Sequence, residues 1–259
     1  MPFTVSHAAA VLPLHRLGKG RLPMAALMVG SMSPDFSYFL PGDLAVLPTH
    51  TFFGLFWFCL PAGLLVWMLF VHLLEAPTIS LLPEDWRVRI TPSRRQVTVA
   101  TLALACVAIV IGAATHVVWD SFTHRWTPVA DALPVLQTPL FKIGDQDIRV
   151  YKLLQHLSTV VGMAILLAWA WRIRHATPHS TRVSPSTIAT AGAPLRTRLA
   201  AAGILLATSG AFAVANYMSH DGVRFERRLY HLAIGGMSGW MLAWCAVAIG
   251  LRWTRKPTA

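Results

Sequence analysis

Charged residues are scarce in this sequence. Of its 259 residues, only 13% are Asp, Glu, Lys or Arg, whereas 55% are hydrophobic. A soluble domain has about 25% charged residues, so this chain would expose large apolar patches in water. Disordered chains have low hydrophobicity, so the composition excludes disorder as well. The sequence is typical of an integral membrane protein.

Cysteine is also rare, and no two cysteines are close in the sequence. The three cysteines, Cys59, Cys106 and Cys245, all lie in apolar stretches and form no CxxC pair. Neither a disulfide framework nor a thiolate metal site follows from them. Basic residues outnumber acidic ones by 22 to 11, but they occur in short groups between apolar runs. Membrane proteins place such groups beside the bilayer, so we expect membrane lipids rather than nucleic acid as partners.

Five segments are long enough to cross about 30 Å of hydrocarbon as helices. None has a charged residue in its middle, and their approximate bounds are Phe52–Leu74, Val97–Trp119, Leu153–Trp171, Leu199–Met218 and Leu229–Leu251. We expect an all-α, polytopic bundle that forms a single integral membrane domain over residues 1–259. Its parts are an N-terminal interfacial region (1–51), three spans (52–171), a flexible basic linker (172–198) and two further spans (199–259).

The apolar stretch Leu22–Leu40 differs from the spans because Gly30, Pro34 and Asp35 interrupt it. Proline and the restricted residue before it disfavour a continuous helix. The pattern predicts a short helix followed by a non-helical turn, which is re-entrant or lies at the surface. A sixth, broken span is the alternative, and it would reverse the expected orientation of the chain in the membrane.

With five spans, the extramembrane pieces alternate between two sides. The side with the N-terminal region and residues 120–152 and 219–228 carries ten Lys and Arg, against 12 on the other side. The positive-inside rule then predicts that the first side is periplasmic or extracellular in a multi-pass protein of the bacterial inner membrane. Eight of the 11 acidic residues lie on that side, and most histidines lie on or near it.

The sharpest local pattern is His116, Asp120 and His124 at the end of the second span. Residues four apart lie on one helix face, so the three form a stripe. His116 and His124 are separated by about 12 Å along the axis, too far for easy sharing of one ion. We expect His116 and Asp120 to bind one metal and His124 to point toward a second, with Asp120 able to bridge them.

Other segments must complete such a site, and the candidates are His7, Asp35 and His50. By topology, His50 begins the first span and His116 ends the second, so both lie at the same membrane face. Imidazoles and carboxylates without thiolates suit zinc, manganese or iron. The alternative for each residue is structural: a buried hydrogen-bonded pair for His116 and Asp120, a helix cap for Asp35, and an interfacial side chain for His7.

These residues resemble a known family. The opening MPFTVSHAAAVLPL, the GSMSPD turn ending at Asp35, Thr49-His50 and the THxxxDxxxH helix are similar to the domain of unknown function 4184 family of bacterial integral membrane proteins. More distantly, they resemble membrane-bound metal-dependent hydrolases, and the HxxxD helix is similar to one in zinc-dependent phospholipases C. The resemblance implies metal ligands at His7, Asp35, His50, His116, Asp120 and His124.

The leading functional hypothesis is a membrane-bound metal-dependent hydrolase that acts at the interface on a lipid or phosphoester. Its cofactor is a divalent metal, with zinc first and manganese or iron as alternatives. Asp35 and His124 are the expected catalytic groups, as general bases. A non-catalytic metal-binding or transport protein is the second hypothesis, and a structural protein with a polar helix-fastening cluster is the third.

Overall fold

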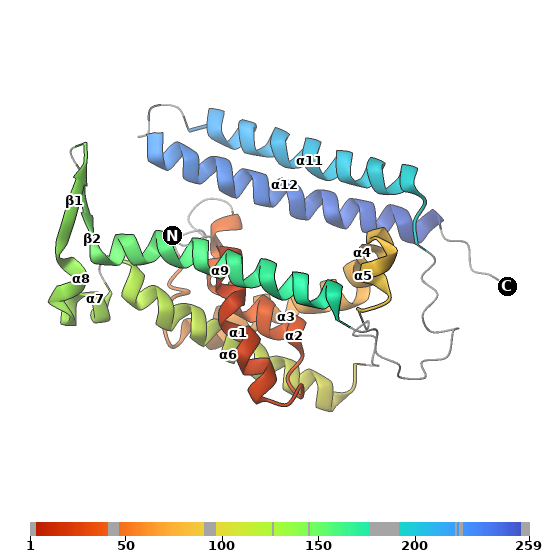
Figure 1. Cartoon of the computed structure of the whole chain (residues 1–259), viewed down its shortest axis with the longest axis horizontal. Coiled ribbons are helices and arrows are strands. Elements are labelled where there is room, and N and C mark those ends of the chain that lie inside the picture. Colours follow the sequence, from red (N-terminus) through yellow and green to blue (C-terminus); the bar gives the residue numbers. More distant parts are fainter. Residues whose placement is uncertain are drawn as a thin grey trace. The chain divides into compact units, whose positions relative to one another are not determined.

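The computed structural model describes residues 4–40, 47–90, 97–125, 127–144, 146–176, 192–220, 222 and 225–254. Within them the chain is helical apart from one short hairpin (Figure 1). Among these residues, five helices are long and apolar enough to cross a membrane, namely Leu55–Leu81, Val99–Thr123, Val150–His175, Leu195–Met218 and Arg227–Thr254. The predicted fold class and number of spans are therefore confirmed, and most of the helices are longer than hydropathy alone indicated.

The chain forms two compact units. The first contains residues Met1–Trp67 and Arg95–Arg172, and the second contains Met68–Arg94 and Ile173–Ala259. The first unit contains all the candidate site residues.

The N-terminal region of the first unit is a helical hairpin with two 3-10 ends. It consists of η1 (Thr4–His7), α1 (Ala8–Leu17), α2 (Met24–Met32) and η2 (Ser33–Phe39). The chain reverses between α1 and α2 through Lys19 and Gly20, whose φ angles are 51° and 71°. Because only glycine adopts such angles without strain, Gly20 supports the reversal. The expected short helix in Leu22–Leu40 is thus present as α2.

The prediction of a non-helical turn after α2 is wrong, because Ser33–Phe39 forms a 3-10 helix. Pro34 lies in its first turn, where a backbone N–H has no helical partner and proline is tolerated. Helical structure therefore continues through Pro34, and the helix type changes from α to 3-10 at Ser33. The change places Asp35 in the first turn of η2, where its side chain is buried.

Helix α2 packs very closely on α6 (Val99–Thr123). A Cβ atom added to Gly30 would lie 2.4 Å from the carbonyl oxygen of Ile109, and one added to Gly112 would lie 2.3 Å from that of Leu27. Both positions therefore require glycine. The close backbone approach brings the carbonyl of Ser31 within hydrogen-bonding distance of His116.

The first span of the chain is an irregular helix. It begins with a π-helical segment, η4 (Leu55–Cys59), continues as α3 (Leu60–Leu69), has a second π segment, η5 (Phe70–Leu74), and ends as α4 (Glu75–Leu81). Prolines 61 and 77 follow shortly after the two π segments, and proline removes one intrahelical donor. The span runs seven residues beyond its expected end at Leu74.

After α6 the first unit continues with two short helices and a hairpin that the sequence analysis did not predict. These are α7 (Pro128–Ala132), α8 (Pro134–Gln137), β1 (Pro139–Ile143) and β2 (Gln146–Arg149), with the strands paired antiparallel. Gly144 has a φ of 57° in the connecting turn. The hairpin leads directly into α9 (Val150–His175).

The second unit contains α11 (Leu195–Met218) and α12 (Phe225–Thr254), which pack along each other, and the short α5 (Glu84–Arg87). In this unit Trp244 donates a hydrogen bond to Thr78 Oγ1 at 2.7 Å. The expected linker 172–198 begins inside α9 and ends inside α11, and its residues 177–191 lie outside the described part of the chain.

Candidate metal centre

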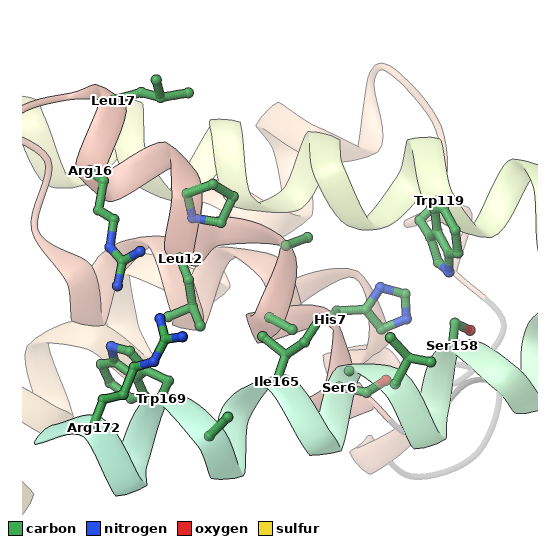
Figure 2. A pocket seen from close by; sticks show the side chains of 16 residues that line it. Ser6, His7, Leu12, Arg16, Leu17, Trp119, Ser158, Ile165, Trp169 and Arg172 are labelled. Carbon is green, nitrogen blue, oxygen red and sulfur yellow. The ribbon is translucent and has the colours of Figure 1, made fainter. Parts of the chain in front are cut away.

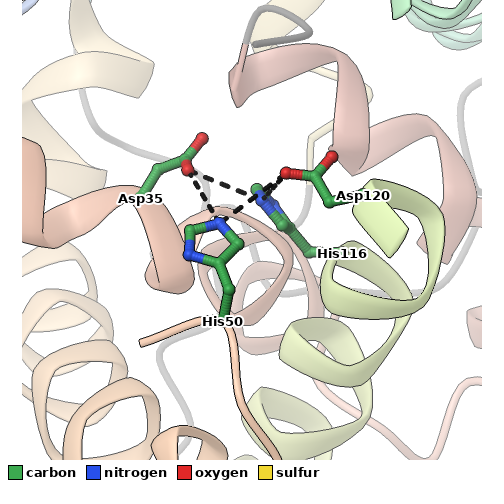
Figure 3. A group of neighbouring side chains, drawn as sticks. All are labelled: Asp35, His50, His116 and Asp120. Carbon is green, nitrogen blue, oxygen red and sulfur yellow. Dashed lines mark ion pairs between the residues drawn. The ribbon is translucent and has the colours of Figure 1, made fainter. Parts of the chain in front are cut away.

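Four polar side chains from three parts of the first unit meet in its interior (Figure 3). Asp35 comes from η2, His50 from the segment before η4, and His116 and Asp120 from the last two turns of α6. One ligand atom of each residue lies within 4.8 Å of the corresponding atom of every other. We call this group the Asp/His cluster, and its residues could hold a metal ion.

The nitrogen–oxygen distances within the Asp/His cluster are all similar, between 3.2 and 3.6 Å. His50 Nε2 is 3.3 Å from Asp35 Oδ1 and 3.6 Å from Asp120 Oδ2. His116 Nε2 is 3.5 Å and 3.2 Å from the same two oxygens. Four ligands at the corners of a tetrahedron, with bonds of about 2.0–2.2 Å, are separated by about 3.3–3.6 Å. The four nitrogen–oxygen distances are thus close to those expected around one tetrahedral ion.

Several polar atoms of this region are buried without a hydrogen-bond partner. They are Asp35 Oδ1, His116 Nε2, Asp120 Oδ1 and His7 Nε2. Most buried polar groups in proteins have a partner, and leaving one unpaired costs about 1–3 kcal/mol. Two of these atoms, on Asp35 and His116, belong to the set of four ligand atoms. A cation among them would satisfy both at once.

Surrounding groups hold the cluster residues in position. His116 Nδ1 lies 2.7 Å from the carbonyl oxygen of Ser31, and because a carbonyl only accepts, Nδ1 carries the proton. In the neutral ring with this tautomer, Nε2 offers its electron pair on the side of the two carboxylates. This is the usual arrangement of a metal-binding histidine, whose second nitrogen donates to a carbonyl or carboxylate.

The other two ligand candidates also have partners behind them. Thr4 Oγ1 donates a hydrogen bond of 2.6 Å to Asp35 Oδ2, the oxygen that faces away from the cluster. Thr49 Oγ1 lies 3.0 Å from His50 Nδ1, as expected for a threonine that orients a ligand. Thr115, the threonine beside His116, instead donates to the carbonyl of Gly112.

The carboxyl group of Asp35 stays ionised. Burial disfavours its charge, but the adjacent imidazoles of His116 and His50 and the Thr4 hydroxyl outweigh this effect and hold its pKa well below the usual range. An ionised carboxylate is the form that binds a metal.

His7 lies against the cluster from the α1 side. Its ring stacks on that of His116, with centroids 3.8 Å apart, and its Nε2 is 3.5 Å from Asp120 Oδ1. Burial, together with the neighbouring His116, lowers the pKa of His7 to about 4, so the imidazole is neutral. The structure therefore places His7 beside the four-residue group, in contact with the second oxygen of Asp120.

His124 does not continue the helical stripe. Helix α6 ends at Thr123, and His124 has an extended backbone with φ −118° and ψ 145°. Its Nδ1 is 3.5 Å from Asp120 Oδ2 and 3.2 Å from the Asp120 carbonyl, while Nε2 faces Gln155 at 3.2 Å. His124 thus contacts Asp120 Oδ2, the oxygen that also faces His50 and His116. The structure brings together no group of three ligands around it among the described residues.

Sequence reasoning missed Gln155 and Thr4 as neighbours of the site. Gln155 is buried on α9 and contacts His124, and Thr4 supports Asp35. Neither residue type is distinctive in sequence, and neither belongs to a spaced motif. Only their placement in three dimensions identifies them.

The fold and the Asp/His cluster together define a polytopic helical membrane protein with a buried group able to hold a metal ion. The chain belongs to the family described as Domain of unknown function (DUF4184), whose profile matches residues 1–249. No curated protein and no solved structure showed significant similarity to it.

Proposed function

We propose that the protein is a metal-dependent hydrolase whose Asp/His cluster binds one divalent ion. The observation that carries the proposal is the convergence of two imidazole nitrogens and two carboxylate oxygens at 3.2–3.6 Å, from residues up to 85 positions apart in sequence. A pair that only fastened helices would satisfy its atoms with hydrogen bonds. Here Asp35 Oδ1 and His116 Nε2 are buried and form no hydrogen bond.

Zinc is the proposed metal. The ligands are two nitrogens and two oxygens, and their four nitrogen–oxygen distances of 3.2–3.6 Å match the edges of a tetrahedral site, the geometry that zinc commonly adopts in proteins. Manganese prefers an octahedral set of oxygen ligands, so it fits this cluster less well. Iron sites of the two-histidine type use one carboxylate, whereas two carboxylates converge here.

The chemistry that such an ion supplies is a bound water of lowered pKa and polarisation of a carbonyl or phosphoryl oxygen. The protein residues have separate roles in this proposal. Both oxygens of Asp35 are engaged, one with the cluster and one with Thr4, so Asp35 acts as a ligand. Proton transfer then falls to an imidazole outside the four ligands, either His7 or His124, each 3.5 Å from an Asp120 oxygen.

A membrane lipid or lipid-linked phosphoester is the proposed substrate class. The site is built on a membrane-spanning helix, where amphiphilic molecules are concentrated. His7 is both a neighbour of the cluster and part of the wall of a largely apolar pocket. A substrate could therefore approach the cluster from an apolar environment.

Metal content and hydrolysis measured on the same preparations test the proposal. Purified protein in detergent is expected to contain one equivalent of zinc. His116→Ala and Asp120→Ala should lose it, whereas His15→Ala, whose imidazole contacts the Leu22 carbonyl outside the cluster, should retain it. Hydrolysis of bis-p-nitrophenyl phosphate and p-nitrophenyl esters should follow the metal content.

The possible failures distinguish the alternatives. Bound metal without hydrolysis of any ester, phosphodiester or lipid would indicate a non-catalytic metal-binding protein. Absence of metal in the wild type, after loading with zinc, manganese and iron(II), would leave a polar cluster that fastens helices.

A further inference from the structure

A pocket of about 840 Å³ lies between α1 and α9 and begins at His7. Its volume is within the range of about 300–1,000 Å³ that is usual for small-molecule sites. Both walls belong to the first compact unit. We call it the α1–α9 groove.

The lining of the α1–α9 groove changes along its length. Figure 2 shows His7, Ser158 and Trp119 gathered at one end and Arg16 and Arg172 at the other. The walls between these ends are apolar and include Leu12, Pro13, Val161, Ile165 and Ala168. Among the residues that the structure describes, no acidic one lines the groove.

The polar end of the groove is continuous with the Asp/His cluster. His7 lines the groove, stacks on His116 and faces Asp120 Oδ1. Only the imidazole of His7 thus separates a polar group at this end of the groove from the proposed metal site. From His7 to Arg16 the axis of α1 rises by about 13 Å, which gives the length of the apolar part.

Arg16 and Arg172 lie at the end of the groove opposite His7. In the described part of the chain neither Arg16 nor Arg172 forms an ion pair, and both are exposed. Arginine side chains of this kind place their methylene stems along apolar surface and their guanidinium groups in water or among headgroups. The stems extend the apolar wall, and the charged ends mark its limit.

From this arrangement we infer that the α1–α9 groove binds the hydrocarbon chain of a membrane lipid, with the lipid's polar linkage at His7 and the chain end toward Arg16 and Arg172. The inference rests on the proposed function for the claim that this lipid is a substrate, and on the groove alone for the claim that the lipid binds. Because α9 is an apolar helix long enough to span the bilayer, a lipid can enter from the side without leaving the membrane.

Photo-crosslinking in phosphatidylcholine nanodiscs tests the binding. Two probes are used, both phosphatidylglycerols with a diazirine on one acyl chain, either near the ester or at the chain end. The ester-proximal probe should label peptides around His7 and Ser158, and the chain-end probe should label those around Arg16 and Arg172. The reverse pattern, or equal labelling of all five spans, would overturn the inference.

A matched pair of variants on α9 gives the control. Ala168 lines the groove, whereas its neighbour Leu167 is 67% exposed and does not line it. Ala168→Trp should reduce labelling of the α1 peptides at least fivefold, and Leu167→Trp should leave it unchanged. Ala10→Trp fills the groove from the opposite wall and should have the same effect if Ala168→Trp fails to fold.

The labelling experiment requires neither metal nor turnover, so it separates the two proposals. Labelling of the groove in a wild-type protein that hydrolyses no ester or phosphodiester would show lipid binding, and the hydrolase proposal alone would fail. If the enzyme is active, Ala168→Trp should raise KM for a long-chain lipid by a larger factor than KM for p-nitrophenyl acetate, whose short chain does not extend along the groove. An equal effect on both substrates would overturn the assignment of the groove to the substrate chain.

Discussion

At the scale of single residues, the Asp/His cluster depends on contacts that fix one nitrogen of each imidazole and one oxygen of Asp35. The spacing of His116 and Asp120 predicts that they share a helix face, and the structure places His116 Nε2 3.2 Å from Asp120 Oδ2. Helical spacing cannot predict that Asp35 and His50 approach the same point, because these distances depend on tertiary packing. It also cannot predict that α6 ends before His124.

The hydroxyl of Thr4 is expected to tune metal affinity. It donates to the Asp35 oxygen that does not face the cluster, and removal of such an outer partner typically costs about 10–100-fold in metal affinity. Thr4→Val should therefore weaken zinc binding by about this factor, as measured by competition with a fluorescent chelator. Thr4→Ser retains the donor and should bind zinc like the wild type. Equal affinity in Thr4→Val and wild type would show that the hydrogen bond does not support the ligand.

His50 differs from the other three cluster residues because its side chain is 29% exposed. Replacement should therefore affect metal binding more than folding. His50→Ala is expected to lower zinc affinity by at least tenfold while its thermal unfolding temperature in metal-free buffer stays near that of the wild type. The buried His116, with no exposed side-chain surface, should lose both metal and stability when replaced by alanine. Similar destabilisation in the two variants would contradict this distinction.

At the scale of elements, hydropathy was enough to predict the five long helices, because a run of about 20 apolar residues is sufficient for a span. It could not predict the extension of the first span to Leu81, since Glu75 and Pro77 interrupt the apolar run and are buried in the structure. The hairpin of β1 and β2 has a Gly144-Asp145 turn signal that the sequence analysis did not use. The 3-10 helix η2 shows that Pro34, in the first turn, is compatible with continued helical structure.

The contact between α2 and α6 links stability to the metal centre. A methyl group on Gly112 would meet the backbone of Leu27 and Ser31, and backbone cannot move aside as a flexible side chain can. Gly112→Ala should cost at least about 1–3 kcal/mol in unfolding free energy. It should also lower zinc content, because Ser31 orients His116.

Gly203 on α11 gives the matched control for Gly112. A Cβ atom there meets nothing within 4 Å, so Gly203→Ala should be neutral or stabilising by about 0.5–1 kcal/mol. Both variants can be compared by thermal loss of helical circular dichroism in detergent and by bound zinc. Equal behaviour of Gly112→Ala and Gly203→Ala would mean that the α2–α6 contact can adjust without disturbing the cluster.

At the scale of the whole molecule, the groove changes the distribution of charge that we expect between the two sides of the membrane. Arg16 lines the same groove as Arg172, which lies three residues before the end of α9 (Figure 2). Alternating spans place that end opposite the end of α6 that carries the cluster. We therefore expect Arg16, and with it Lys19 and Arg21 in the following turn, on the side opposite the cluster. The ratio of Lys and Arg between the two sides becomes seven to 15.

This ratio gives a definite expectation for topology. Cytoplasmic loops carry the excess of Lys and Arg, so we expect the Asp/His cluster to lie near the non-cytoplasmic face of the membrane.

Single cysteines, in a background with the three native cysteines replaced by serine, test this orientation. Lys142→Cys, on the exposed hairpin at the cluster side, should react with an impermeant maleimide in intact bacterial cells. Thr254→Cys, at the exposed end of α12, should react only after permeabilisation. The opposite pattern would place the cluster toward the cytoplasm and would restrict its lipid substrates to the inner leaflet. Labelling of both cysteines in intact cells would be incompatible with five alternating spans.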